Sequence, residues 1–146
     1  MSMKAWILIL EDDAVIQDNF MLSLENLVNL PRGQKTWINL NDGVGPNLFK
    51  HKTDPTLEYG GFYEVNPPMT RCTVAYLVNQ ELAKEILNEF EIHGIPNWVP
   101  IDFAIDAVLK KLKVNCLWQD PACVLQGSSN GNYQSNLQQH RIKNAE

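Results

Sequence analysis

The segment Trp6-Ile7-Leu8-Ile9-Leu10-Glu11-Asp12-Asp13 places five large apolar residues directly before three acids. An apolar run without polar alternation is typical of a strand that is covered on both faces. We therefore predict that residues 4–10 form a buried strand that leads a central sheet. The acidic cluster at its end, Glu11-Asp12-Asp13, is the predicted functional centre. The alternative is a polar strand end that enters solvent.

The rest of the chain alternates between strand-like and helix-like segments. Strands are expected at residues 36–40, 62–65, 70–78 and 114–118, and helices at residues 19–30, 80–90 and 102–112. This alternation predicts an α/β fold with a largely parallel or mixed central sheet flanked by helices. Ligands of such sheets bind at the carboxyl ends of the strands, which is where the acidic cluster falls. The expected domain spans residues 1–126, with a long loop at residues 41–61 and a polar, loosely ordered tail at residues 127–146.

Composition narrows the class of protein. The chain has 146 residues, enough for one domain, and its net charge of −5 disfavours nucleic acid as a partner and suits a cation site. The apolar run at residues 6–10 is too short to span a membrane or to act as a signal sequence. The three cysteines, Cys72, Cys116 and Cys123, include no CxxC pair, so we expect free thiols and a reducing, cytoplasmic location.

The chemistry of the acidic cluster indicates a divalent cation. Alternation along a strand places Glu11 and Asp13 on one side and Asp12 on the other. Two carboxylates held close together are costly unless a cation or a proton lies between them. Hard carboxylate oxygens favour Mg²⁺ or Mn²⁺, so Asp13 and Glu11 are the candidate metal ligands.

Residues 4–15 resemble the start of a response-regulator receiver domain, whose first strand also ends in an acidic Mg²⁺ pocket. The resemblance does not continue along the chain. The nearest candidate for the phosphorylated aspartate of that family, Asp54, follows no apolar run, and the chain contains no Lys-Pro pair.

A longer resemblance, over about residues 4–136, is to glycosyltransferase family 25, the lipooligosaccharide and procollagen galactosyltransferases. Residues 5–14 resemble its strand with the DxD-type metal motif, residues 70–78 its second signature, and residues 80–87 the helix that follows. Residues 95–102 resemble its segment of a proline and then an aspartate before a helix. Residues 121–126, with Ser128 or Ser135, resemble its closing strand and serine.

This resemblance implies a GT-A fold and metal-dependent transfer of a sugar from a nucleotide-sugar donor to a glycan acceptor, as in lipopolysaccharide biosynthesis. Galactose is the sugar that the family implies. Asp13 would be the main ligand of Mn²⁺ or Mg²⁺, and Glu11 would bind the metal or the donor ribose. Arg71 would pair with a donor phosphate, and a plain surface arginine is the alternative. Asp102 would be the base of an inverting reaction, and a helix cap is its alternative role.

Other polar and aromatic residues have less specific interpretations. Asp106 is expected to be an exposed helix residue. The aromatic side chains are expected either to stack on sugar rings or to pack in the core; these are Tyr59, Phe62, Tyr63 and Trp98. The three histidines, His51, His93 and His140, show no metal-ligand spacing.

Only ten residues precede Glu11, whereas a single βαβ unit needs about 30. The nucleotide-binding half that precedes this motif in the family is therefore expected to be missing. The protein is then a fragment, a chain completed by a partner, or a reduced descendant. Two functions stay open: a sugar transferase, and a non-enzymatic remnant that binds a metal, a glycan or a protein. A homodimer joined through an exposed sheet edge is a further hypothesis.

Overall fold

The computed structural model describes residues 5–27, 35–41 and 61–128. Within these ranges the chain forms seven strands and three helices. The strands are β1 (Trp6–Leu10), β2 (Ala14–Ile16), β3 (Thr36–Asn39), β4 (Phe62–Glu64), β5 (Ala75–Asn79), β6 (Asn115–Gln119) and β7 (Val124–Gln126). The helices are α1 (Phe20–Asn26), α2 (Gln80–His93) and α3 (Ile101–Lys111).

The central sheet contains five strands in the order β1-β5-β3-β6-β4. The pair β3–β6 is parallel, whereas β1–β5, β3–β5 and β4–β6 are antiparallel. The predicted α/β class with a mixed central sheet is confirmed, but the largely parallel arrangement is wrong. A hydrophobic pattern locates a strand without giving its direction, and β5 runs antiparallel between β1 and β3. The all-parallel sheet that a receiver-like domain would have is not found in the described residues.

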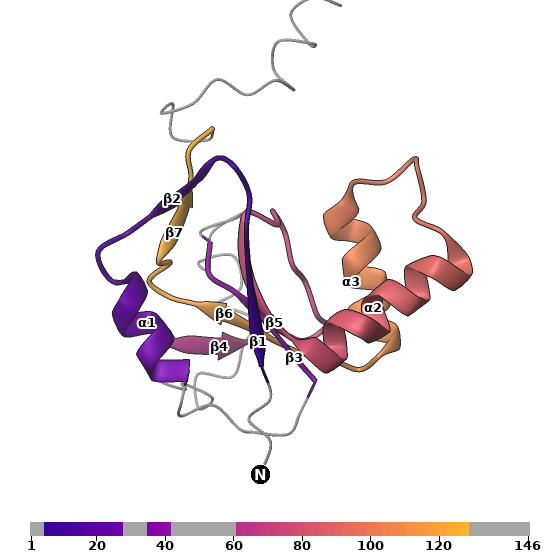
Figure 1. The fold of residues 1–146 in the computed structure, drawn as a ribbon, viewed down its shortest axis with the longest axis horizontal. Coiled ribbons are helices and arrows are strands. Elements are labelled where there is room, and N and C mark those ends of the chain that lie inside the picture. The colour runs from indigo at the N-terminus through magenta and orange to yellow at the C-terminus, as the bar shows by residue number, and fades with distance from the viewer. Residues whose placement is uncertain (1–4, 28–34, 42–60, 129–146) are drawn as a thin grey trace, which may run out of the picture.

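Helices cover both faces of the sheet (Figure 1). On one face, Phe20 of α1 joins a core that includes Ile38 and Leu117 of the sheet. On the other face, α2 and α3 pack on a second core; its buried side chains include Leu82, Ile86, Ile105, Leu109, Trp37, Val78 and Trp118. The buried helix positions follow the three-and-four spacing of an amphipathic helix, as the sequence predicts.

The ends of the long helices follow local sequence signals. The side chain of Asn79 caps α2 by accepting a hydrogen bond from the Leu82 N–H at 2.7 Å, and Gly94 ends this helix with a positive φ of 73°. Pro100 occupies the N-cap position of α3, and Asp102 lies in the first turn, where its Oδ1 accepts a hydrogen bond from the Phe103 N–H at 3.0 Å. The first helix, predicted at residues 19–30, spans Phe20–Asn26, with Asn19 at its N-cap and Leu27 at its C-cap. Residues 28–34 lie outside the described ranges.

The first strand is an edge strand, and the prediction that it is buried on both faces is wrong. Four of its five side chains are 37–39% exposed: Trp6, Ile7, Leu8 and Leu10. The buried cores beneath the helices are built on the central strands β3, β5 and β6, and from β1 Ile9 packs against one of them as a partly buried residue. An unbroken apolar run therefore marked a strand correctly but did not reveal its place at the edge of the sheet.

A second, two-stranded sheet was not predicted as such. In it β2 pairs antiparallel with β7, from Ala14 opposite Gln126 to Ile16 opposite Val124. This small sheet packs with α1 on one side of the central sheet (Figure 1). It fixes the chain just after the acidic cluster, because the turn at residues 11–13 joins β1 to β2. None of the helices in the described ranges has the length and apolar character needed to cross a membrane.

Candidate functional site

The acidic cluster forms a tight turn at the carboxyl end of β1. The Ala14 N–H donates to the Glu11 carbonyl oxygen at 3.2 Å, which reverses the chain between β1 and β2. Glu11 and Asp12 are exposed, and Asp13 is half-buried. The strand alternation predicted for the three acids does not apply, because the strand ends at Leu10. The two candidate ligands therefore have different surroundings.

Glu11 is tied to the segment that leads into β5. Its backbone N–H donates to the Val74 carbonyl oxygen at 2.8 Å, and its Oε1 accepts a hydrogen bond from the Thr73 hydroxyl at 2.6 Å. Tyr76, two residues into β5, stacks on Trp37 with a centroid distance of 4.0 Å. Burial, and next the negative charge of Glu11, raises the pKa of Tyr76. The Glu11 carboxylate therefore lies close to the face of the sheet that α2 and α3 cover.

Residues 70–73, here named the Thr70 loop, also contact the start of α3. The predicted strand at residues 70–78 is a strand only from Ala75 onward. The Thr70 N–H donates to Asp106 Oδ1 at 2.6 Å, and the Thr70 hydroxyl donates to the Asp102 carbonyl oxygen at 3.2 Å. The Cys72 N–H donates to Asp102 Oδ2 at 3.4 Å. One short loop thus connects the acidic turn to the first turns of α3.

Asp106 is buried, so the prediction that it is an exposed helix residue is wrong. Its exposed fraction is 6%, and its carboxylate faces the Thr70 backbone. Burial raises the pKa of Asp106, although the hydrogen bonds from Thr70 and the charges of Lys110 and Arg71 act in the opposite direction. Asp106 therefore positions the Thr70 loop from beneath. Asp106 lies one helical turn after Asp102, on the side of α3 that carries buried Ile105 and Leu109. Its position beside these apolar residues was the sequence signal for its burial.

A buried polar network, which we did not predict from the sequence, connects the Thr70 loop to the central sheet. The Met69 carbonyl oxygen accepts hydrogen bonds from Asn39 Nδ2 at 3.3 Å and from Trp118 Nε1 at 2.8 Å. Asn41 Nδ2 donates to the Cys72 carbonyl oxygen. Asn39 and Asn41 are fully buried, and their alternation at the end of an otherwise apolar strand was the available signal. Both ends of the loop are therefore held by side chains of the sheet.

Arg71 occupies the outer part of the Thr70 loop. It has a positive φ of 28°, and Cys72 follows with a φ of 59°. The Arg71 guanidinium lies over the Phe103 ring, 4.3 Å from its centroid. Stacking uses the flat face of the guanidinium and leaves the N–H groups in its plane for an acceptor. The loop therefore presents a half-buried cation at Arg71, while its next residue, Cys72, contacts the half-buried carboxylate of Asp102.

Asp13 is held by the segment that follows β7, whereas Glu11 is held by the Thr70 loop. Its Oδ2 accepts hydrogen bonds from the Ser128 hydroxyl at 2.6 Å and from the Ser128 N–H at 3.4 Å. The Gly127 N–H donates to the Asp13 carbonyl oxygen at 2.8 Å. Gly127 and Ser128, assigned to the tail by sequence, thus contact the acidic turn, and residues 129–146 lie outside the described ranges.

The fit of a divalent cation to these carboxylates is partial. Among residues 5–27, 35–41 and 61–128, buried Asp13 Oδ1 meets no hydrogen-bond donor, so this hard oxygen suits a cation or a water molecule. Glu11 already accepts the Thr73 hydroxyl through Oε1. Across the described ranges, no group of three or more His, Cys, Asp or Glu side chains is placed to hold a metal ion. A metal at Asp13 would thus need oxygen ligands from its substrate or from water.

The predicted site residues therefore separate into two groups. Glu11, Arg71 and Asp102 meet around the Thr70 loop, and Asp13 belongs to the acidic turn but is anchored by Ser128. Trp98, in the connection from α2 to α3, is 82% exposed, whereas Phe62 is buried in the core and Tyr63 is half-buried. His93 ends α2, and its exposed side chain pairs with half-buried Glu89. Four further residues of the sequence interpretation lie outside the described ranges: His51, Asp54, Tyr59 and His140.

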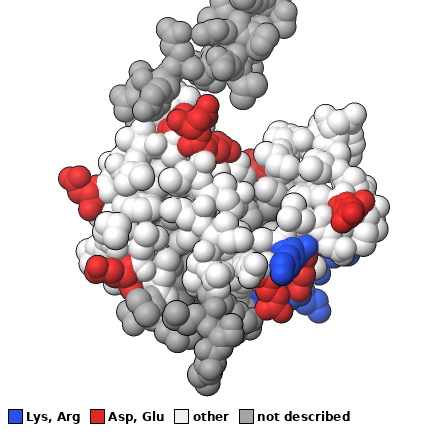
Figure 2. Space-filling model, in the orientation of Figure 1, with Lys and Arg blue, Asp and Glu red and all other residues white. Residues whose placement is uncertain are grey.

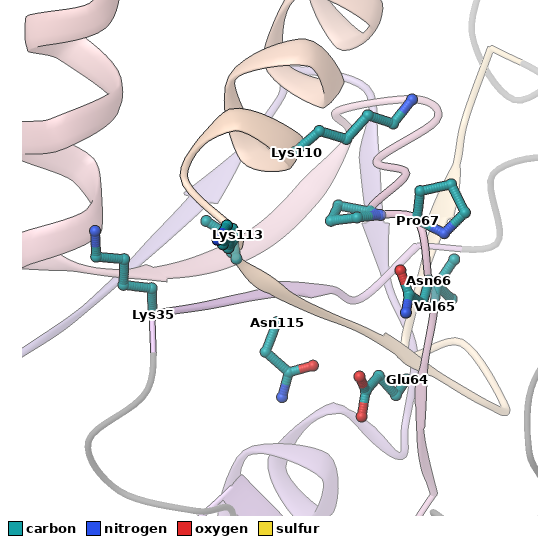
Figure 3. Close-up of a pocket in the computed structure, with 10 residues that line it drawn as sticks. Lys35, Glu64, Val65, Asn66, Pro67, Lys110, Lys113 and Asn115 are labelled. Atoms are coloured by element: carbon teal, nitrogen blue, oxygen red, sulfur yellow. The ribbon is translucent and has the colours of Figure 1, made fainter.

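A cleft of about 640 Å³ lies at the other end of the sheet (Figure 3). It is lined from the amino ends of β3 and β6, including Lys35 and Asn115, and from the chain that follows β4. Lys35 is paired with Glu85 at 2.6 Å. Figure 3 shows the ends of Lys35 and Lys110 on opposite sides of the view, so these ammonium groups do not converge on one anion. We therefore place the candidate site at the acidic turn and the Thr70 loop.

Comparison with models of known protein families finds no match, and neither does comparison with curated proteins.

Proposed function

We propose that the chain carries a sugar-transfer site of the family 25 type, where a metal-dependent reaction moves a sugar from a nucleotide-sugar donor to a glycan acceptor. The observation that supports this proposal is the arrangement of the Thr70 loop. It hydrogen-bonds to Glu11 on one side and to Asp102 on the other. These are the segments through which the sequence resembles that family, although they are far apart along the chain. Galactose is the proposed sugar on the basis of the same resemblance.

The donor side of the proposed site consists of Asp13, Glu11 and Arg71. Asp13 Oδ1 and the second oxygen of Glu11 would hold Mn²⁺ or Mg²⁺. The ion, when bound, supplies a Lewis acid for the negative charge that develops on the departing pyrophosphate. Arg71 would pair with a phosphate through the N–H groups that its contact with Phe103 leaves available. The Thr73 hydroxyl keeps the Glu11 carboxylate oriented, because it donates to Oε1.

The acceptor side of the proposed site is the start of α3. Asp102, the proposed base, is half-buried; its Oδ1 accepts the Phe103 N–H at 3.0 Å, and its Oδ2 accepts a longer, 3.4 Å contact from the Cys72 N–H. The longer contact leaves Oδ2 as the less engaged oxygen, which could accept the proton of an acceptor hydroxyl. Asp106 is less suited to this role because it is buried against Thr70. Trp98 presents an aromatic surface close along the chain to Asp102, and sugar rings stack on such surfaces.

The test uses uridine diphosphate and uridine diphosphate galactose, each with Mn²⁺. Calorimetry on wild type and Asp13→Asn measures nucleotide binding, and release of galactose from the donor measures turnover. Asp13→Asn should weaken binding. Asp102→Asn should retain binding but lose about 10²- to 10⁴-fold in transfer, as expected for a general base. Asp18→Asn, an exposed aspartate just before α1, is the matched control. Turnover that is unchanged in Asp102→Asn would remove this residue from the proposed mechanism.

The non-enzymatic alternative is favoured by one observation. The end of α2, the connection to α3 and the start of α3 expose large apolar side chains; these are Ile92, Ile95, Trp98, Ile101 and Phe103. Such a group suits the binding of a glycan or a protein even without chemistry. The two functions are distinguished by measuring glycan binding and donor turnover on the same preparation. Binding that depends on Trp98, without any turnover, would favour the binding module.

A further inference from the structure

The outer edge of β1 carries backbone groups that point away from the sheet. The Ala5 carbonyl oxygen accepts from Gln80, and the Glu11 N–H donates to Val74, so the odd-numbered residues of this segment face β5. Because backbone groups alternate along an antiparallel strand, the N–H and C=O groups of Trp6, Leu8 and Leu10 point outward. In the described ranges β1 pairs with β5 alone.

The side chains of β1 include none of the features that prevent an edge strand from pairing with another chain. The strand reads Trp-Ile-Leu-Ile-Leu and contains no charge, proline or glycine. By contrast, the opposite edge strand, β4, has three residues and includes Glu64. Natural proteins usually protect edge strands by shortness, charge or proline, and β1 has none of these features. Figure 2 shows a broad area without charged side chains on the face where β1 lies in Figure 1.

We infer that β1 is a dimerisation strand, which pairs antiparallel with β1 of a second copy of this chain across a twofold axis at Leu8. In this register Leu8 faces Leu8 of the second copy, and Trp6 faces Leu10. The outward backbone groups then form hydrogen-bonded pairs, and the two central sheets join into one continuous sheet. Trp6, Leu8 and Leu10 share one face of the sheet, so the exposed side chains of the two copies cover one another.

The charges beside β1 select the antiparallel direction. Glu11 and Asp12 are exposed directly after the strand. In a parallel pair these acids would lie beside the same acids of the second copy, and like charges placed opposite each other are destabilising. In the antiparallel pair they lie at opposite ends of the shared ladder. A second copy of the chain therefore suits the outer edge of β1. Its own β1 offers apolar side chains along the whole pairing, and the antiparallel direction separates the acids of the two copies.

The size of the contact indicates a weak, reversible dimer. A five-residue strand is about 17 Å long, and the strand-to-strand contact is smaller than the roughly 800 Å² per partner of a standard stable interface. We therefore expect the dimer to form at high micromolar concentration and to dissociate on dilution.

Sedimentation equilibrium over a dilution series tests this inference with two charged variants. Leu8→Lys and Leu8→Glu should each weaken dimerisation by about tenfold or more, because the introduced charge meets its own copy across the twofold axis. An equimolar mixture of the two variants should restore the dimer, because opposite charges then face each other. Leu87→Lys, at a 68% exposed position on α2, is the matched control and should dimerise like wild type. Circular dichroism confirms that each variant is folded.

Several results would overturn the inference. These are a wild-type chain that stays monomeric at high concentration, a dimer that survives both Leu8 variants, or a mixture that fails to recover. Growth beyond the dimer would also overturn it, since a closed twofold contact uses β1 completely. The outcome is independent of the proposed transferase function, because sugar transfer and self-association are measured separately.

Discussion

Asp106→Ala should destabilise the protein by about 2 kcal/mol because it removes the acceptor for a buried backbone group. The Thr70 N–H donates to Asp106 at 2.6 Å, Thr70 is fully buried, and Asp106 is 6% exposed. Leaving a buried donor without a partner costs about 1–3 kcal/mol. For a chain of this size, a loss of about 2 kcal/mol corresponds to a decrease in Tm of about 4–8 °C. Urea unfolding followed by tryptophan fluorescence measures the change.

Asp106→Asn separates the acceptor from the charge. The amide oxygen still accepts from Thr70, so we expect stability close to that of wild type at low pH, where the Asp106 carboxyl is protonated and also neutral. Burial raises the pKa of Asp106 above its ordinary value of 3.8, so the native state holds this proton more tightly than the unfolded state. Stability of the wild type should therefore fall, relative to Asp106→Asn, as the pH rises from about the ordinary value through the raised pKa. Below that window the two proteins should respond to pH alike.

An exposed aspartate provides the control for both variants. Asp18→Ala should change stability by less than about 0.5 kcal/mol, as is usual for a surface position. If Asp106→Ala is as stable as Asp18→Ala, Asp106 does not hold the Thr70 loop, and the account of this loop is refuted.

Three further changes test other parts of the structure. Asn79→Ala should lower the free energy of unfolding by about 1 kcal/mol in urea titrations, because it removes the side-chain cap of α2. In native protein treated with iodoacetamide, mass spectrometry should show half-buried Cys72 modified first and Cys116 unmodified, because Cys116 is buried and burial raises its pKa to about 12. Ser128→Ala should cost about 1 kcal/mol by thermal unfolding and loosen Asp13, since it removes the 2.6 Å hydrogen bond to that carboxylate.

Much of the secondary structure was predictable because its signals are local. The helix that begins after Asn79 and ends at Gly94 has both a cap and a stop, and its apolar spacing gave its buried face. The strand β3 was predicted at residues 36–40 and is found at Thr36–Asn39. In each of these cases the residues that determine the element lie within it or directly beside it.

The position of each element in the sheet was not predictable in the same way. Trp6 to Leu10 has the composition of a central strand, yet only neighbours distant in sequence decide whether it is central or at an edge. The Thr70 loop was predicted as a strand because its residues are β-formers. The positive φ angles at Arg71 and Cys72 accompany instead two contacts that sequence spacing does not reveal: the Cys72 N–H donates to Asp102, and the Cys72 carbonyl oxygen accepts from Asn41.

The candidate site was also only partly predictable from the sequence. Glu11, Asp13, Arg71 and Asp102 were all identified by sequence, and the contacts of the Thr70 loop connect three of them. The supporting residues were missed, since a buried Asn in a strand or an Asp in a helix has a partner that sequence spacing does not reveal. Asp106 and Asn41 are such residues.

The central claim is that the acidic turn, the Thr70 loop and the start of α3 form one site for a metal-bound ligand. Paramagnetic broadening of backbone amide resonances by Mn²⁺, with uridine diphosphate present, tests this claim most directly. We predict that residues 11–13, 70–73 and 101–103 broaden first, and that Asp13→Asn abolishes the effect. Broadening centred on the cleft around Glu64 and Asn115, or broadening that persists in Asp13→Asn, would contradict the account.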